Sequence, residues 1–146
     1  GGLKGIFHNK ISYMKEKGIN VFLNVSKEVG KSKLKDLTMK ENNLLSKIIG
    51  VFLDNAREAA MNSKDKEVSI CVYMEEDKIV FEISNTFAGE VNLDNIYDSG
   101  YSSKGKNRGY GLSVVKTIVD ENNIFKNETE ITKGYFVQRL IVNKTK

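Results

Sequence analysis

The clearest pattern of hydrophobic and polar positions lies in residues 39–61 and has the period of an amphipathic helix. At about 100° per residue, one face of this helix carries six apolar side chains: Leu45, Ile48, Ile49, Phe52, Ala56 and Ala59. Thr38 and Glu41 have the spacing of a capping box at the start of the segment. The pattern therefore predicts a helix over residues 39–61 that packs on a sheet through its apolar face.

The other segments alternate between helical and strand patterns. Apolar residues at helical spacing predict helices over residues 3–17 and from about 112 to 122. Alternating apolar residues predict strands over residues 19–25, 66–74, 78–84, 125–131 and 135–142. Residues 26–37 are polar and basic, which predicts a connecting loop. Together these elements predict one α+β domain, a two-layer α/β sandwich whose mixed sheet has helices on one face.

Two details of the strands are also predicted. The alternation of the first strand places Ile19, Val21, Leu23 and Val25 on one face. Cys71, the single cysteine, lies within the second strand and has no partner for an internal disulfide. We expect it to be a small core residue of a protein in a reducing compartment.

Composition narrows the class of protein. Of the 146 residues, 40% are hydrophobic and 29% are charged, which is typical of a globular domain, and no apolar run is long enough to span a membrane. The single histidine, His8, excludes most histidine-rich metal sites. The net charge of +4 comes from basic residues scattered among acidic ones, so no nucleic-acid partner is indicated.

Asn55 is a polar residue at the edge of the predicted apolar face, about 60° from Phe52. A half-buried amide that finds no hydrogen-bond partner costs about 1–3 kcal/mol. Two interpretations stay open on this stretch alone. The amide is bonded to neighbouring backbone, or it binds a ligand.

Residues 104–112 are rich in glycine and open the last predicted helix. Backbone N–H groups at a helix start suit a phosphate, glycines allow close approach, and the cations Lys104, Lys106 and Arg108 add positive charge. A purely structural turn explains the glycines equally well. The segment has neither the ending of a Walker loop nor the strand before it that a dinucleotide fingerprint requires.

Four features follow one another along the chain and favour a ligand-binding interpretation. They are Asn55 on a helix, Asn85 at a strand end, the long polar stretch of residues 89–108 and the glycine-rich helix start. A carbonyl oxygen of Asn is a ligand that Mg²⁺ accepts together with water. The amide of Asn85 has the acceptor and donors needed to read the amino edge of adenine. The combination predicts a site for Mg–ATP.

These motifs resemble those of the ATP-binding catalytic domain of sensor histidine kinases, which belong to the GHKL superfamily and have the Bergerat α/β sandwich fold. Residues 53–59, Leu-Asp-Asn-Ala-Arg-Glu-Ala, resemble the N-box, and residues 83–86 stand where the first glycine box begins. Residues 101–105 and 108–113 resemble the lid and the second glycine box. The likeness covers nearly the whole chain, and more narrowly it is to the AgrC-like kinases of peptide quorum sensing.

The resemblance implies a role for each matched position. Asn55 is the implied Mg²⁺ ligand and Asn85 the implied reader of adenine. Lys104 and Arg108 are implied to lie in the lid near the phosphates. Backbone contacts to the nucleotide are implied for Gly109, Gly111 and Leu112, and further candidates for the site are Glu58, Gly105 and Tyr110.

Three features depart from the family pattern. Asn85 stands where the first glycine box has Asp, and the glycines of that box are out of register at Phe87 and Gly89, which predicts a modest affinity for nucleotide. Val51 stands one helical turn before Asn55, where ATP-hydrolysing relatives carry a glutamate base, which favours transfer to a protein histidine over hydrolysis. The phosphoacceptor motif is absent, and His8 lies where no acceptor is expected.

The resemblance also implies an organisation and partners. Residues 1–18 are expected to end a helical connection from a missing dimerisation domain with the phosphoacceptor histidine, and residues 19–146 to form the catalytic domain. The fragment is expected to be monomeric and inactive alone, as the cytoplasmic part of a membrane-anchored, homodimeric parent that passes phosphate to a response regulator. The alternative is a docking module of this fold without kinase activity, which the altered first glycine box favours.

Overall fold

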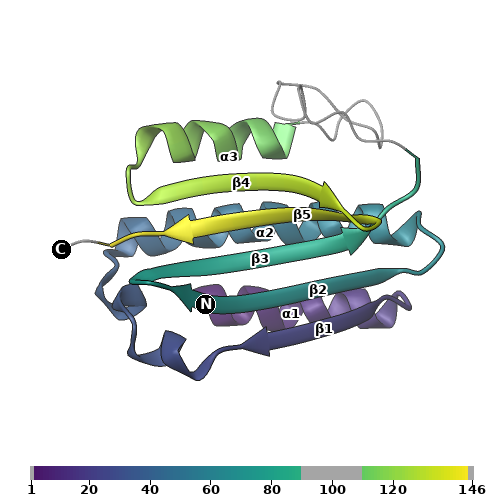
Figure 1. The fold of residues 1–146 in the computed structure, drawn as a ribbon, viewed down its shortest axis with the longest axis horizontal. Helices are drawn as coiled ribbons and strands as arrows, with labels where there is room; N and C mark the ends of the chain where they lie inside the picture. Colours follow the sequence, from purple (N-terminus) through teal and green to yellow (C-terminus); the bar gives the residue numbers. More distant parts are fainter. Residues whose placement is uncertain (1, 90–109, 145–146) are drawn as a thin grey trace.

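The computed structural model describes residues 2–89 and 110–144, which form a mixed five-stranded sheet with α-helices packed against it (Figure 1). In chain order the elements are α1 (Gly2–Glu16), β1 (Asn20–Val25), the 3₁₀ turns η1 (Lys27–Lys31) and η2 (Lys33–Asp36), α2 (Met39–Met61), β2 (Glu67–Glu75), β3 (Lys78–Thr86), α3 (Tyr110–Glu121), β4 (Phe125–Thr132) and β5 (Tyr135–Val142). The strand order is β1-β2-β3-β5-β4. β1 runs parallel to β2, and the other neighbouring strands are antiparallel.

The helices all pack on the same face of the sheet. Buried residues of α1, α2 and α3 form one cluster with alternate residues of the strands. α2 lies between α1 and α3 and contacts both (Figure 1). The predicted two-layer α+β sandwich with helices on one face is therefore confirmed.

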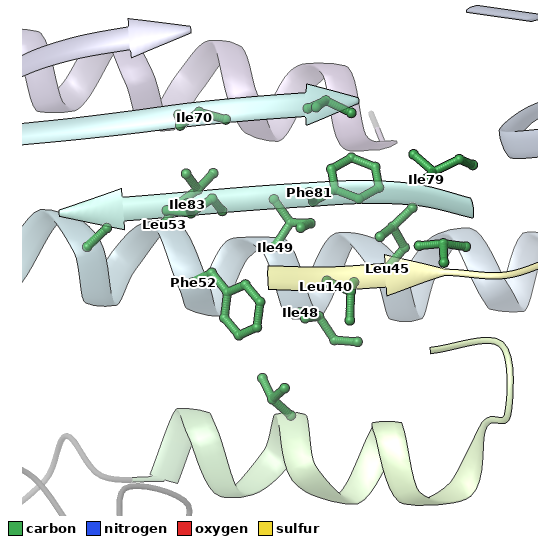
Figure 2. Packing of buried hydrophobic residues seen from close by; sticks show 14 of the residues in the cluster. Leu45, Ile48, Ile49, Phe52, Leu53, Ile70, Ile79, Phe81, Ile83 and Leu140 are labelled. Carbon is green, nitrogen blue, oxygen red and sulfur yellow. The ribbon is translucent and has the colours of Figure 1, made fainter. Parts of the chain in front are cut away.

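α2 forms the main ridge of the core because its apolar face is buried along most of its length. Figure 2 shows side chains of α2 gathered against β3 and β5, among them Ile49 near Phe81 and Ile48 near Leu140. The sequence pattern correctly places Leu45, Ile48, Ile49, Phe52 and Ala56 in this core. It is wrong near the end of the helix, where Ala59 is partly exposed and Ala60 is buried. It also omits Leu53, which is fully buried.

The start of α2 is fixed by the predicted capping box, which is confirmed. The Thr38 side chain accepts a hydrogen bond from the backbone N–H of Glu41 at 3.1 Å, and the Glu41 carboxylate accepts one from the backbone N–H of Thr38 at 2.8 Å. Lys144, just after β5, donates to both oxygens of the same carboxylate at 2.9 and 3.2 Å. The bond from Lys144 and then the bond from the Thr38 backbone lower the pKa of Glu41 below its ordinary value.

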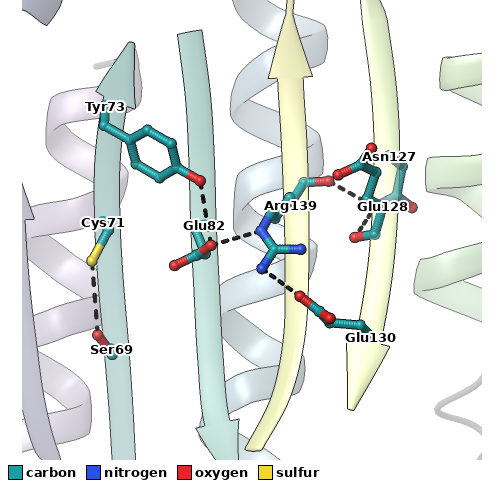
Figure 3. A network of polar contacts seen from close by, with 8 residues as sticks. All are labelled: Ser69, Cys71, Tyr73, Glu82, Asn127, Glu128, Glu130 and Arg139. Atoms are coloured by element: carbon teal, nitrogen blue, oxygen red, sulfur yellow. Dashed lines mark hydrogen bonds and ion pairs between the residues drawn. The ribbon is translucent and has the colours of Figure 1, made fainter. Parts of the chain in front are cut away.

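The face of the sheet opposite the helices carries a polar network (Figure 3). Arg139 of β5 donates to Glu82 of β3 at 2.6 Å and to Glu130 of β4. Burial alone lowers the pKa of Arg139, but its bonds to the two carboxylates raise that pKa by more. Cys71 lies on this face beside the network and is partly exposed, so its prediction as a core residue is wrong. The alternation of β2 directs its neighbours, not Cys71, into the core.

β1 is an edge strand, and its predicted apolar face is only partly buried. Ile19 is 3% exposed and Val21 is half-buried, but Leu23 and Val25 are 51% and 53% exposed. α1 packs mainly against α2 and leaves the second half of β1 uncovered. The alternation identified the strand correctly but could not show that its far end lacks a covering layer.

The predicted loop over residues 26–37 is in fact ordered as η1 and η2, so that prediction is wrong in detail. Val29 and Leu37 are buried against the core. The Ser32 side chain caps η2 by accepting from the backbone N–H of Leu34 at 3.2 Å. Two isolated apolar residues are enough to hold this short segment on the protein, although they form no periodic pattern.

The capping box leads to a prediction about stability and pH. Substituting Glu41→Gln removes the charge that Lys144 and the Thr38 backbone stabilise, so we expect the free energy of unfolding at pH 7 to fall by about 1 kcal/mol. Because the folded pKa of Glu41 is lowered, this stabilisation is present above the ordinary value of 4.5 and is lost as pH falls through the folded pKa. Denaturant unfolding at pH 7 and pH 3 measures the difference.

The exposed turn residue Glu76 provides the matched control, since Glu76→Gln makes the same chemical change without such partners. A deficit of Glu41→Gln that persists unchanged at pH 3 would contradict the linkage to this carboxylate.

Candidate functional site

One flank of α2 carries Val51, Asn55 and Glu58. Their spacing of four and three residues places them on one side of the helix, beside the buried Phe52. All three are partly buried, and both Asn55 and Glu58 interact with other groups of the protein. The predicted position of Asn55 at the edge of the apolar face is therefore confirmed.

The first turn of α3 lies directly against this flank. A Cβ atom added to Gly111 would come within 3.0 Å of Cγ1 of Val51, which is closer than side chains normally approach. Gly111 therefore has a structural reason to be glycine, since the backbone of α3 passes over Val51. Leu112, the next residue, packs against the core. The glycine-rich helix start and the helix that carries Asn55 are thus brought together.

Asn85 lies near the end of β3 and points to the helical side of the sheet. It alternates with the core residues Ile79, Phe81 and Ile83 and is only 3% exposed. Its Nδ2 donates to the backbone carbonyl of Thr86 at 3.0 Å. A carboxylate in this position could not donate that bond, which gives a physical reason for an amide where the family pattern has an acid.

A buried hydroxyl pair joins the end of β3 to the end of α2, and the sequence analysis missed it. The Oγ atom of Ser63 lies 2.6 Å from Oγ1 of Thr86, and Ser63 also donates to the carbonyl of Ala60 at 2.7 Å. The backbone N–H of Glu67 donates to the Thr86 hydroxyl at 3.0 Å. These bonds hold Asn85, the neighbour of Thr86, in a fixed relation to α2. No periodic signal marks such a pair in the sequence.

β5 supplies further residues on the same side of the sheet that the sequence analysis did not single out. Phe136 is the register partner of Asn85. Gln138 is buried, and its Oε1 accepts hydrogen bonds from Nδ2 of Asn127 at 3.0 Å and from Oγ1 of Thr129 at 2.7 Å. A polar residue within the apolar alternation of β5 was a signal that could have found Gln138.

The remaining predicted residues divide into two groups. Tyr110 is the first residue of α3. The lid candidates Lys104, Gly105 and Arg108 lie outside the described residues, and so does Gly109, a candidate for backbone contacts. The structure therefore places Gly111, at the start of α3, against Val51 on the α2 flank that also carries Asn55 and Glu58.

The side chains of this flank suit a metal ion that is held mainly by the phosphate groups of a bound substrate and only in small part by the protein. Within residues 2–89 and 110–144 no group of three or more His, Cys, Asp or Glu side chains is placed to hold a metal ion. Mg²⁺ commonly keeps several waters and binds through substrate phosphates and one or two protein oxygens. One amide oxygen, from Asn55, meets that requirement.

A cavity of about 590 Å³ lies elsewhere in the protein. It is lined by residues of η1, the β2–β3 turn and the segment after β5, including Lys31, Asp77 and Lys144. The turn lies at the end of β3 opposite to Asn85. The cavity contains none of the residues predicted from the motifs, so it does not belong to the candidate site.

The close approach of α3 to α2 leads to a test. Gly111→Ala places a methyl group against Val51, so we expect the free energy of unfolding to fall by about 1–2 kcal/mol. In a Val51→Ala background the clash is absent, and the same substitution should cost much less. Denaturant unfolding of the two single variants and the double variant measures this coupling.

Gly50→Ala is the control, because a Cβ atom there meets only Cε of Lys10 at an ordinary 3.7 Å. Alanine is the better helix former, and a gain of about 0.5–1 kcal/mol is expected. Equal costs of Gly111→Ala with and without Val51 would refute the packing explanation.

The chain is similar to known proteins both in sequence and in fold. The sensor protein CitS of Halalkalibacterium halodurans is 31% identical over 142 residues, which cover 92% of this chain and 26% of that protein. The chain thus spans about a quarter of the length of this curated relative. The catalytic domain of histidine kinase ThkA superposes with a TM-score of 0.73 at 14% identity over 97% of this chain and 90% of that one.

A second solved structure, full-length ShkA in complex with AMPPNP, superposes with a TM-score of 0.67 at 18% identity, covering 99% of this chain and 31% of that chain. At such identities the likeness shows a shared fold. The sequence profile of the family described as GHKL domain matches residues 40–143, which contain α2, the end of β3, α3 and β5. The chain therefore belongs to the GHKL domain family.

Proposed function

We propose that this chain is the ATP-binding catalytic domain of a sensor histidine kinase, which transfers the γ-phosphate of ATP to a histidine on a separate dimerisation domain. The observation that carries the proposal is the contact of Gly111, at the start of α3, with Val51, one helical turn before Asn55 on α2. α3 begins at the end of the sheet where β3 ends (Figure 1), and Asn85 lies at that end of the strand, next to its final residue Thr86. Membership of the GHKL family and the similarity to a sensor protein favour this function over a docking module.

In this proposal Asn55 holds Mg²⁺ through its amide oxygen. The residue is partly buried on the flank of α2 beside Phe52 and interacts with other groups of the protein. When bound, the metal supplies charge neutralisation for the phosphates. The neighbouring Glu58 is on the same flank and is a candidate for orienting the groups around it.

Asn85 is proposed to recognise the adenine base. Its Nδ2 is engaged with the Thr86 carbonyl, so the amide is oriented and its Oδ1 is the atom suited to accept a bond from the adenine amino group. The Ser63–Thr86 hydroxyl pair keeps this strand end in place. An uncharged acceptor gives a weaker bond than a carboxylate, which agrees with the modest affinity predicted from the sequence.

The start of α3 is proposed to bind the phosphates. The first N–H groups of a helix have no partner within the helix, and its dipole favours an anion there. Gly111 and Leu112 would contribute backbone contacts, joined by Gly109, Gly105 and Tyr110. Lys104 and Arg108 would add positive charge from the lid.

Val51 is proposed to favour a protein acceptor over water. It is apolar and packs against Gly111, so it cannot take a proton from an attacking water molecule. In the proposed reaction a neutral imidazole nitrogen attacks the γ-phosphorus, and the bond from that phosphorus to the β–γ bridging oxygen breaks. ADP leaves with the electron pair. Catalysis then rests on alignment and charge neutralisation.

The parent protein is proposed to be a membrane-anchored homodimer. Residues 1–18 would lead from its dimerisation domain, residues 19–146 would form the cytoplasmic catalytic domain, and a response regulator would take the phosphate from the acceptor histidine. No helix within residues 2–89 and 110–144 is long and apolar enough to cross a membrane. Membership of the narrower AgrC-like subfamily rests on the motifs alone and stays a prediction.

The binding site is tested by titrating the protein with ATP in the presence of Mg²⁺. We expect saturable binding by the wild type and a loss of about tenfold or more in the Asn55→Ala variant, because a metal ligand is removed. Calorimetry measures both affinities. Circular dichroism shows whether the variant is folded. Equal affinities, or no binding by the wild type at millimolar ATP, would contradict the proposal.

Phosphoryl transfer is tested in the full-length natural protein. Incubation with ATP labelled at the γ-phosphate should give an acid-labile, base-stable label on a histidine outside residues 19–146, and Asn55→Ala should abolish it. His8→Gln should leave the label unchanged, since His8 is not the proposed acceptor. A protein that binds ATP but acquires no label would support the docking module instead.

A further inference from the structure

A polar contact joins α1 to α2 at the residue before Asn55. Nζ of Lys10 lies 2.8 Å from Oδ1 of Asp54, across 44 residues of sequence. The stem of Lys10 passes close to Gly50, where an added Cβ would be 3.7 Å from its Cε. The lysine therefore lies along α2 for about one turn and ends on the carboxylate next to the proposed metal ligand.

A second contact holds the same turn of α2. The guanidinium of Arg57 lies 5.2 Å from the centre of the Tyr13 ring, and Nζ of Lys17 lies 5.3 Å from that ring. Arg57 also lies 4.0 Å from Asp54 through its Nη2. Such cation–aromatic contacts are attractive, and the one between Arg57 and Tyr13 extends the contact between the helices by one turn of α1.

Asp54 and Arg57 stand before and after Asn55 in the sequence, but their side chains lie on a different flank of α2. At 100° per residue, Asn55 shares its side with Val51 and Glu58, whereas Arg57 lies more than a third of a turn away on the side of α1. α2 is thus contacted on two flanks within two turns of the helix, by Gly111 of α3 at Val51 and by Lys10 and Tyr13 of α1 at Asp54 and Arg57.

We propose that Lys10 and Tyr13 are positioning residues of the nucleotide site, which fix the rotation of the α2 turn that carries Asn55. This inference rests on the proposed function of Asn55 as the metal ligand. Neither residue contacts the nucleotide in this scheme. Their effect is exerted through Asp54 and Arg57, so it falls on the metal-dependent part of binding and not on the part due to Asn85 and α3.

The experiment compares ATP affinity with Mg²⁺ and with EDTA for the whole chain and its variants. Lys10→Met keeps most of the stem but removes the charge, and we expect it to weaken Mg–ATP binding about fivefold, the upper range for a partly exposed ion pair. Tyr13→Ala should act in the same direction. The affinity for ATP in EDTA should be unchanged in both variants, which a general loss of structure would not produce.

Four further variants test the positioning role. Lys15→Met makes the same charge change at an exposed position of α1, and Tyr13→Phe retains the ring, so both should bind Mg–ATP as the wild type does. Asp54→Asn should weaken Mg–ATP binding as Lys10→Met does. The double variant Lys10→Met with Asp54→Asn should be no worse than either single variant, since both remove one interaction.

The outcomes separate the two proposals. A wild type that binds no nucleotide would overturn the proposed function, and this inference with it. A wild type that binds Mg–ATP with unchanged affinity in Lys10→Met and Tyr13→Ala would overturn the positioning role alone. Equal losses with Mg²⁺ and with EDTA, or additive losses in the double variant, would also overturn it.

Discussion

Burial of the apolar face of α2 against the sheet is the interaction on which the rest of the structure depends. Ile48, Ile49 and Phe52 are fully buried, and each such side chain contributes about 1.5–3 kcal/mol relative to exposure. A helix cannot rotate about its axis without exposing them. The buried face therefore sets the overall direction of both flanks, one toward α1 and the other toward α3. Within that limit, the contacts of Lys10 and Tyr13 are proposed to hold the turn that carries Asn55.

The second constraint is the use of small residues where elements must approach closely. Gly111 lets the backbone of α3 pass over Val51, and Gly50 leaves room for the stem of Lys10. At the end of α2, Ser63 is short enough to stay buried while it bonds to both Thr86 and the helix backbone. Three separate segments are thereby held close to α2 or to its end. A site built this way depends on backbone placement more than on any single charged group.

Much of this architecture could be predicted from the sequence because it depends on local periodicity. The period of 3.6 identified α2 and most of its buried face, and the alternation of apolar residues identified each strand. The capping box of Thr38 and Glu41 marked a helix start correctly. The sequence singles out Asn55 because it is a polar residue beside an apolar helix face. It singles out Gly111 because a glycine is unfavourable within a helix and this one stands in a helix start.

The features that escaped prediction are set by tertiary contacts. Exposure of Leu23 and Val25 depends on how far α1 extends over β1, and the burial of Leu53 depends on packing between elements that the period of α2 does not encode. The Ser63–Thr86 pair joins residues 23 positions apart, and the Lys10–Asp54 pair joins residues 44 apart. No periodic pattern encodes such pairs, because each partner is an ordinary surface or turn residue by its own local sequence.

The two edges of the sheet differ in a way that bears on how the protein behaves in concentrated solution. β4, at one edge, carries Lys126, Glu128 and Glu130, and charged side chains oppose the addition of another strand. β1, at the other edge, has no charged residue or proline and exposes Phe22, Leu23 and Val25. Charged side chains therefore protect the β4 edge of the sheet, and β1 has no charged side chain to protect the other edge. An added strand is expected to pair more readily with β1 than with β4.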